Sequence, residues 1–189
     1  MSRIARFAFA VFSAFVLPLV ASAAPPKAYV GNFKDNTVSV IDTASAAAVG
    51  TIAVAAGPHG MTQTPDGRNV YVSGDASASV SVIDTATDRV VRTLDVGKSP
   101  HGLAMTPNGR VLLVGVYGED SVAFFDTTTH QKVASAVVPK PHTIAVRPDG
   151  SVAYVASQEP GKFALAVVDL TSFAVIRRVA LDKPPREFQ

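Results

Sequence analysis

The sequence predicts an all-β fold, a β-propeller built from four-stranded antiparallel blades, on the strength of three observations. A unit of about 42 residues recurs, as the spacings of 42, 42 and 43 residues between four aspartates show: Asp42, Asp84, Asp126 and Asp169. A fixed period of about 40–45 residues with strand-like content is typical of propeller blades. Alternating apolar segments such as residues 79–83 (SVSVI) fill each unit, and alternation of this kind indicates half-buried strands. Asp-Gly or Asn-Gly pairs recur at residues 66–67, 108–109 and 149–150, where they favour tight turns.

The central copy shows how each element is expected to form. A strand over residues 103–106 ends at the Pro-Asn-Gly turn of residues 107–109, and the next strand covers residues 111–115. The third strand covers residues 79–83, and Asp84 and Thr85 turn the chain into the fourth strand, residues 90–96. Loops of variable content follow the second strands: residues 32–36, 74–78, 117–120 and 158–162. Because these loops differ most between copies, individual specificity is expected to lie there.

Several short motifs recur in one order and resemble the YVTN family of β-propeller repeats, found in bacterial surface-layer and periplasmic propellers. In the first copy they are residues 28–32 (AYVGN), 38–43 (VSVIDT), 57–60 (GPHG) and 64–67 (TPDG). The resemblance covers the chain after residue 27 and implies the propeller fold. It says little about function, because propellers carry unrelated activities.

Residues 1–23 resemble a secretory signal peptide that would be cleaved near Ala23. Arg3 and Arg6 precede an apolar run over residues 7–20, and Ala21-Ser22-Ala23 supplies the small residues of a cleavage site. The alternative is a membrane anchor, but the run is short for a helix that must span with about 20 apolar residues, and Pro18 interrupts it. We therefore expect a periplasmic or secreted protein with no transmembrane segment after cleavage.

The charge of the mature chain gives no electrostatic support for binding nucleic acid. The signal carries two of the 17 basic residues, so residues 24–189 contain 15 basic and 15 acidic side chains. No basic stripe is visible, and such a stripe is the usual footprint of nucleic-acid binding. The sequence contains no cysteine, so neither a disulfide nor thiol chemistry is available.

The propeller domain is expected over residues 24–189, in repeat units of approximately 28–69, 70–110, 111–151 and 152–189. The first unit lacks an innermost strand, and the last ends three residues into the next innermost strand. Proteins that resemble this chain generally have about seven blades, so a truncated or half propeller is favoured over a closed four-bladed ring. Such an arc would expose the apolar faces of its terminal blades, which predicts self-association.

Three histidines occupy the same repeat position, just before the innermost strand: His59, His101 and His142. The fourth copy carries Arg186 there. Equivalent loops of successive blades meet near the central channel, so these four residues are the candidate ligand-binding residues. Three imidazoles would also suit a divalent metal. The alternative, which the repetition favours, is that each histidine has a structural role in its own blade.

The repeated aspartates (Asp42, Asp84, Asp126 and Asp169) are expected to stabilise turns, because Asp followed by Thr at a hairpin caps the turn through its own backbone. No catalytic residue and no cofactor is predicted, and no Gly-x-Ser-x-Gly nucleophile motif is present. The sequence therefore favours a non-enzymatic binding scaffold for a protein, polymer or surface component. The alternative is a propeller enzyme or redox accessory, lactonase-like or metal- or cofactor-binding, that uses channel-facing histidines.

Overall fold

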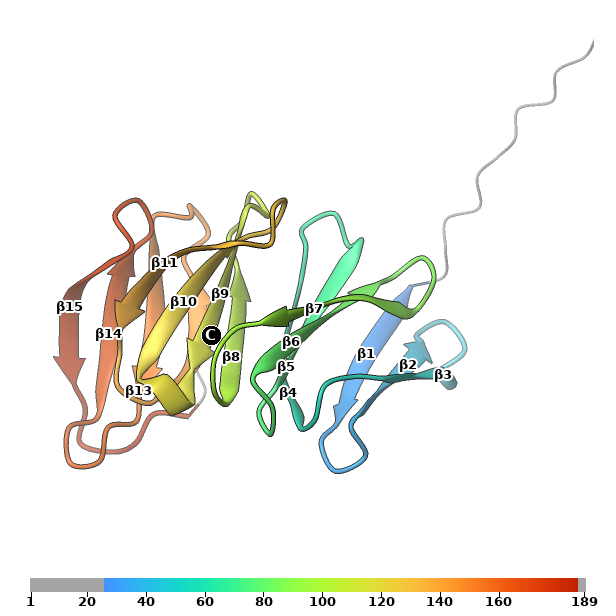
Figure 1. The fold of residues 1–189 in the computed structure, drawn as a ribbon, viewed down its shortest axis with the longest axis horizontal. Helices are drawn as coiled ribbons and strands as arrows, with labels where there is room; N and C mark the ends of the chain where they lie inside the picture. The colour runs from blue at the N-terminus through green and yellow to red at the C-terminus, as the bar shows by residue number, and fades with distance from the viewer. Residues whose placement is uncertain (1–25, 187–189) are drawn as a thin grey trace, which may run out of the picture.

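The computed structural model describes residues 26–186, which form four antiparallel β-sheets that follow one another along the chain (Figure 1). The export signal predicted for residues 1–23 lies outside the described residues. The first sheet contains β1 (Lys27–Asn32), β2 (Thr37–Asp42) and β3 (Ala47–Ala53). The second contains β4 (Pro58–Gln63), β5 (Asn69–Gly74), β6 (Ser79–Asp84) and β7 (Arg89–Asp95). The third contains β8 (Pro100–Met105), β9 (Val111–Val116), β10 (Ser121–Asp126) and β11 (Lys132–Val137). The fourth contains β12 (Pro141–Val146), β13 (Val152–Ser157), β14 (Ala164–Asp169) and β15 (Ala174–Ala180).

Each sheet is a propeller blade in which every strand pairs with its neighbour in sequence, as β4-β5-β6-β7 shows. The all-β prediction is therefore confirmed, and among residues 26–186 the first sheet has three strands, β1-β2-β3. A single 3-10 turn, η1 (Tyr117–Glu119), is the only helical element among residues 26–186. Within that range no helix is long and apolar enough to cross a membrane.

Three apolar layers hold neighbouring blades together. Val38 and Val40 of the first blade pack with Val72 and Ile83 of the second. Tyr71 belongs to the layer between the second and third blades, and further apolar residues form the layer between the third and fourth, among them Leu113, Phe124, Val155 and Val168. Burial of side chains of this size contributes about 1.5–3 kcal/mol each, so the blades are stabilised mainly by their neighbours.

The blades form an open arc, with the first and fourth sheets at opposite ends (Figure 1). Consequently one face of each terminal blade has no neighbour. Val30 on the free face of the first blade is 48% exposed, whereas its repeat equivalent Val72 is 1% exposed. At the other end Val179 is 41% exposed, whereas its equivalent Leu94 is 7% exposed. The prediction of an incomplete propeller therefore agrees with the structure.

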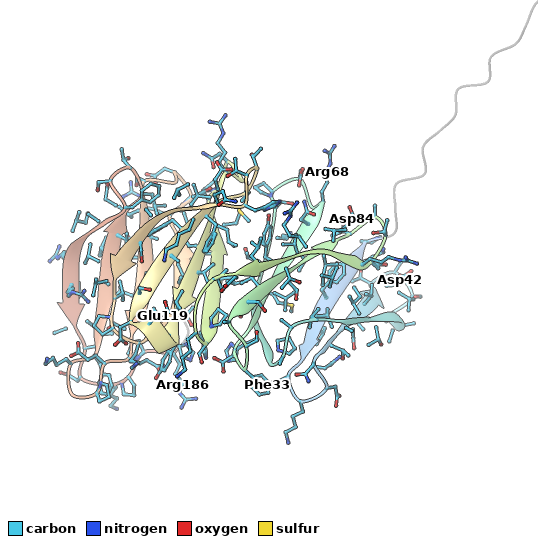
Figure 2. All side chains as sticks on the ribbon, viewed as in Figure 1. Phe33, Asp42, Arg68, Asp84, Glu119 and Arg186 are labelled. Atoms are coloured by element: carbon cyan, nitrogen blue, oxygen red, sulfur yellow. The ribbon has the colours of Figure 1, made fainter. Side chains whose placement is uncertain are left out.

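The arc has two rims. On one, here called the histidine rim, the innermost strands begin at Pro58, Pro100 and Pro141 and the loops after β1, β5, β9 and β13 lie. On the other, here called the turn rim, lie the Asp-Gly and Asn-Gly turns and the turns after β2, β6, β10 and β14. Figure 2 shows Phe33, Glu119 and Arg186 along the histidine rim and Arg68 and Asp84 along the turn rim.

In every blade, the turn that leads to the outermost strand has a left-handed backbone at the same repeat position. This residue lies four positions after the repeated aspartate, and its φ is 53°, 52°, 59° and 55° in the four copies: Ala46, Asp88, His130 and Phe173. The backbone is thus constant, while the side chain at this position differs in each copy.

Candidate functional site

Close packing of the innermost strands positions the three repeated histidines. His59, His101 and His142 are the second residues of β4, β8 and β12. A side chain at Gly60 or Gly102 would overlap the carbonyl oxygen of the next histidine along the arc, that of His101 or His142 respectively. Glycine at these two positions therefore lets each innermost strand lie directly against the next.

The three imidazoles stack on one another along the histidine rim. The ring centroids of His59 and His101 are 3.7 Å apart, and those of His101 and His142 are 4.1 Å apart, with interplanar angles of 45° and 43°. Aromatic rings extend the stack at its sides, since the His59 ring lies 6.3 Å from Phe33 and the His101 ring 5.8 Å from Tyr117. We call these three histidines the histidine stack.

Burial and crowding keep the middle imidazole uncharged. Desolvation lowers the pKa of His101 from 6.5 to about 4, with further contributions from the neighbouring His59 and His142, which would repel a second positive charge. At neutral pH His101 is therefore a neutral hydrogen-bonding ring. Beside it, Lys140 lies 5.3 Å from the Tyr117 ring centroid and pairs with Asp120 at 3.0 Å.

The candidate residue of the fourth copy, Arg186, joins the same site through its backbone. His142 Nδ1 lies 3.0 Å from the Arg186 carbonyl oxygen, which also accepts a hydrogen bond from the Thr143 hydroxyl. Gln158 donates to the carbonyl oxygen of Pro185 at 2.7 Å. The structure thus brings all four predicted residues to one open pocket of about 450 Å³, together with Asp75 and Tyr117.

The three imidazoles are tilted against one another and line one pocket. This arrangement suits a ligand that lies on an aromatic surface and exchanges hydrogen bonds with ring nitrogens. A metal site would instead need several nitrogen lone pairs directed at one point. Among residues 26–186, no group of three or more histidine, aspartate or glutamate side chains is placed to hold a metal ion.

The four repeated aspartates lie on the turn rim, at the opposite ends of the blades from the histidine stack. Each carboxylate accepts hydrogen bonds from backbone N–H groups two or three residues later, as Asp126 does from Thr128 at 2.9 Å and Thr129 at 2.7 Å. Backbone donors of this kind hold the pKa of the Asp126 carboxyl below its usual value. The structure therefore does not bring these carboxylates together with the histidines.

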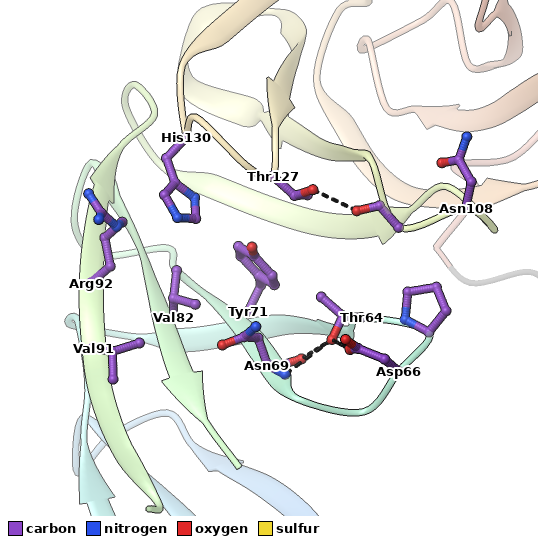
Figure 3. A pocket seen from close by; sticks show the side chains of 12 residues that line it. Thr64, Asp66, Asn69, Tyr71, Val82, Val91, Arg92, Asn108, Thr127 and His130 are labelled. Carbon is purple, nitrogen blue, oxygen red and sulfur yellow. Dashed lines mark hydrogen bonds between the residues drawn. The ribbon is translucent and has the colours of Figure 1, made fainter. Parts of the chain in front are cut away.

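A second pocket, which the sequence analysis did not predict, lies on the turn rim between the second and third blades (Figure 3). Its lining includes Tyr71, Arg92 and His130. The sequence contained one signal for it. The fourth residue after the repeated aspartate is different in every copy, whereas its neighbours in the repeat vary less.

The fold and its repeated rim define the class of this chain, which is a β-propeller protein. Residues 26–109 match the family described as YNCE-like beta-propeller. Among solved structures, the Kuenenia stuttgartiensis hydrazine synthase is similar to this chain, with 25% sequence identity and a TM-score of 0.79. The similarity covers 82% of this chain and 46% of that one, so the chain spans less than half the length of that structure. No curated protein matches the sequence. These matches concern β-propellers in general, and the more specific resemblance to the YVTN repeat stays a prediction.

Proposed function

We propose that the protein is a non-enzymatic binding scaffold that holds its ligand on the histidine rim. The observation that carries this proposal is the histidine stack, in which one side chain from each of three blades lines a single open pocket. A rigid propeller fixes these rings in advance, so that a ligand loses little free energy in ordering them.

The chemistry of the stack favours binding over catalysis. An effective general base has a pKa near the working pH, whereas the pKa of His101 lies at about 4. The repeated aspartates are engaged in turns at the other ends of the blades, and the one carboxylate that lines the histidine pocket is that of Asp75. The site therefore offers aromatic surface and hydrogen bonds, and its ligand would be a protein, polymer or surface component of the cell envelope.

Export predicted from residues 1–23 determines which ligands should be tested. We would measure binding of the exported protein to purified peptidoglycan and to outer-membrane vesicles, with His101→Ala and Tyr117→Ala as histidine-rim variants. The control is Thr128→Ala, an exposed position on the turn rim. Binding that the two rim variants weaken at least tenfold and the control leaves unchanged is the expected result. Binding that is equal in all four proteins would overturn the proposal.

A second function, a propeller enzyme or redox accessory, has one observation in its favour. Three histidines do converge on one pocket, and such rings can hold a metal or a substrate in a propeller channel. Two measurements distinguish the functions: the metal content of the purified protein and hydrolysis of a panel of lactones. Turnover or stoichiometric metal that His101→Ala abolishes would favour the enzyme over the scaffold.

A further inference from the structure

The pocket on the turn rim lies at a position where the three interfaces between blades can be compared directly. At each interface, the middle of one blade's second strand faces the left-handed turn residue of the next blade. The pocket at the middle interface has a volume of about 490 Å³. At the other two interfaces, side chains of the protein itself fill the same position.

Between the first and second blades, a carboxylate of the chain fills this position. The Tyr29 hydroxyl donates to Asp88 Oδ1 at 2.7 Å, and Lys27 Nζ donates to Asp88 Oδ2 at 2.6 Å. Asp88 is the left-handed turn residue of the second blade. A tyrosine hydroxyl and a cation therefore satisfy one partly buried carboxylate.

Between the third and fourth blades, apolar side chains fill the position. Leu113 takes the place of the tyrosine, and Phe173 is the left-handed turn residue of the fourth blade. The rings of Phe124 and Phe173 pack with their centroids 4.8 Å apart. Leu113, Phe124 and Phe173 have no polar side-chain atoms, so these three side chains need no hydrogen-bond partner here.

The middle interface keeps the tyrosine and a cation but has no carboxylate between them. Tyr71, the equivalent of Tyr29, is 2% exposed, and within residues 26–186 its hydroxyl has no hydrogen-bond partner. The turn residue opposite it is His130, whose Nδ1 is buried without a partner. Arg92 of β7 lines the same pocket and forms no ion pair within the described residues. Figure 3 shows Tyr71 rising into the pocket toward the turn that carries His130, with Arg92 at the side.

Of these polar groups, His130 Nδ1 is buried without a partner, which is costly. Arg92 is exposed at the open side of the pocket, where its guanidinium is available to a ligand. The one acidic side chain that lines the pocket, Asp66, already accepts a hydrogen bond from the Thr64 hydroxyl at 2.6 Å and faces Arg68. It is therefore not the missing partner of Arg92 and Tyr71. The rest of the lining includes Val82 and Val91, which offer a small apolar surface beside the polar groups.

We propose that this pocket binds a small organic carboxylate with an apolar body, whose carboxylate group lies among Tyr71, Arg92 and His130 and takes the role that the Asp88 carboxylate has at the neighbouring interface. Arg92 and the Tyr71 hydroxyl donate to the carboxylate oxygens, and the valines contact the apolar body. This site lies on the opposite rim from the histidine stack, so the inference is independent of the function proposed above.

The test is a titration of the full chain with benzoate, followed by the backbone amide resonances of Asn69 and Gly109 at the pocket. Acetate, neutral benzamide and inorganic phosphate serve as comparison ligands. We expect saturable binding of benzoate, weaker binding of acetate, and none of benzamide or phosphate. Arg92→Gln and Tyr71→Phe should each weaken benzoate binding about tenfold or more, because each removes a charge-assisted hydrogen bond. The matched controls Arg177→Gln and Tyr154→Phe, at the same repeat positions of the fourth blade, should leave binding unchanged.

A second variant tests the same inference by supplying the carboxylate from the chain itself. His130→Asp would place a carboxylate in a left-handed position, which aspartate tolerates, and would copy the arrangement of Tyr29 and Asp88. We expect this variant to lose benzoate binding and to melt at a higher temperature than the wild type. Equal binding of benzoate and benzamide, preference for phosphate, binding that survives Arg92→Gln, or no carboxylate binding at all would overturn the proposal. A fall in melting temperature on His130→Asp would also contradict it.

Discussion

Acid should destabilise this protein through His101 before it protonates most of the carboxylates. The pKa of His101 lies at 6.5 when the chain is unfolded and at about 4 in the folded protein, mainly because burial disfavours the imidazolium ion. Between these two values the unfolded chain binds a proton that the folded protein does not. The free energy of unfolding therefore falls as the pH decreases from 6.5 to about 4, and the full contribution is present above 6.5.

The size of this effect follows from the displacement of the pKa. Complete exclusion of the proton over that interval would correspond to about 3 kcal/mol. Solvent reaches part of the His101 ring, so screening reduces the expected loss to about 1–2 kcal/mol. The rings of His59 and His142, whose centroids lie 3.7 Å and 4.1 Å from that of His101, contribute to the lowered pKa of His101, because a charge on either ring would repel a charge on His101.

Urea unfolding of the wild type and of His101→Asn at pH 7, 5.5 and 4 measures this loss. The aspartate turns also lose stability in acid, since their pKa values are lowered by backbone hydrogen bonds, but they do so in both proteins. The difference between the two proteins therefore isolates His101. An NMR titration midpoint of the His101 ring at or above 6.5, or the same pH dependence in both proteins, would refute the reasoning.

Three further predictions concern packing, association and metal. Ser73→Ala should lower the free energy of unfolding, measured by urea titration, by about 1–3 kcal/mol. The buried Ser73 hydroxyl donates to the His101 carbonyl oxygen at 2.6 Å and accepts from the Gly60 N–H at 2.8 Å. An unchanged urea midpoint would contradict this prediction. Residues 24–189 should self-associate through the free faces of the terminal blades, and Val30→Lys should weaken that association in light scattering, whereas a monomer at every concentration would argue against it. Added Zn²⁺ or Cu²⁺ should leave the melting temperature unchanged, and a saturable rise that each single histidine variant abolishes would make the histidine stack a metal site.

The blades could be predicted from the sequence because strand alternation and turn chemistry are local and recur in every copy. Residues 79–83 and 111–115 were expected to be strands and lie within β6 and β9. The missing innermost strand also followed from the register of the repeat. Such features depend on residues close in sequence, and repetition removes most of their ambiguity.

The geometry of the two rims could not be predicted in the same way. That His59, His101 and His142 approach one another follows from the repeat, but their stacking depends on the distance between innermost strands, which Gly60 and Gly102 permit. The pocket on the turn rim was harder still to predict, because Tyr71 has the same repeat position as Tyr29. Only the residue opposite, in the next blade, distinguishes the two tyrosines.

The open arc also has a consequence for the order in which the protein unfolds. Each blade packs only against its neighbours along the chain, so the molecule behaves as a short one-dimensional array. The first and fourth blades have one neighbour each, and the second and third have two. Local opening at the two ends therefore requires less free energy than opening in the middle. Amide hydrogens of β2 and β14 should exchange before those of β6 and β10, so that loss of the terminal blades precedes loss of the pair that encloses the turn-rim pocket.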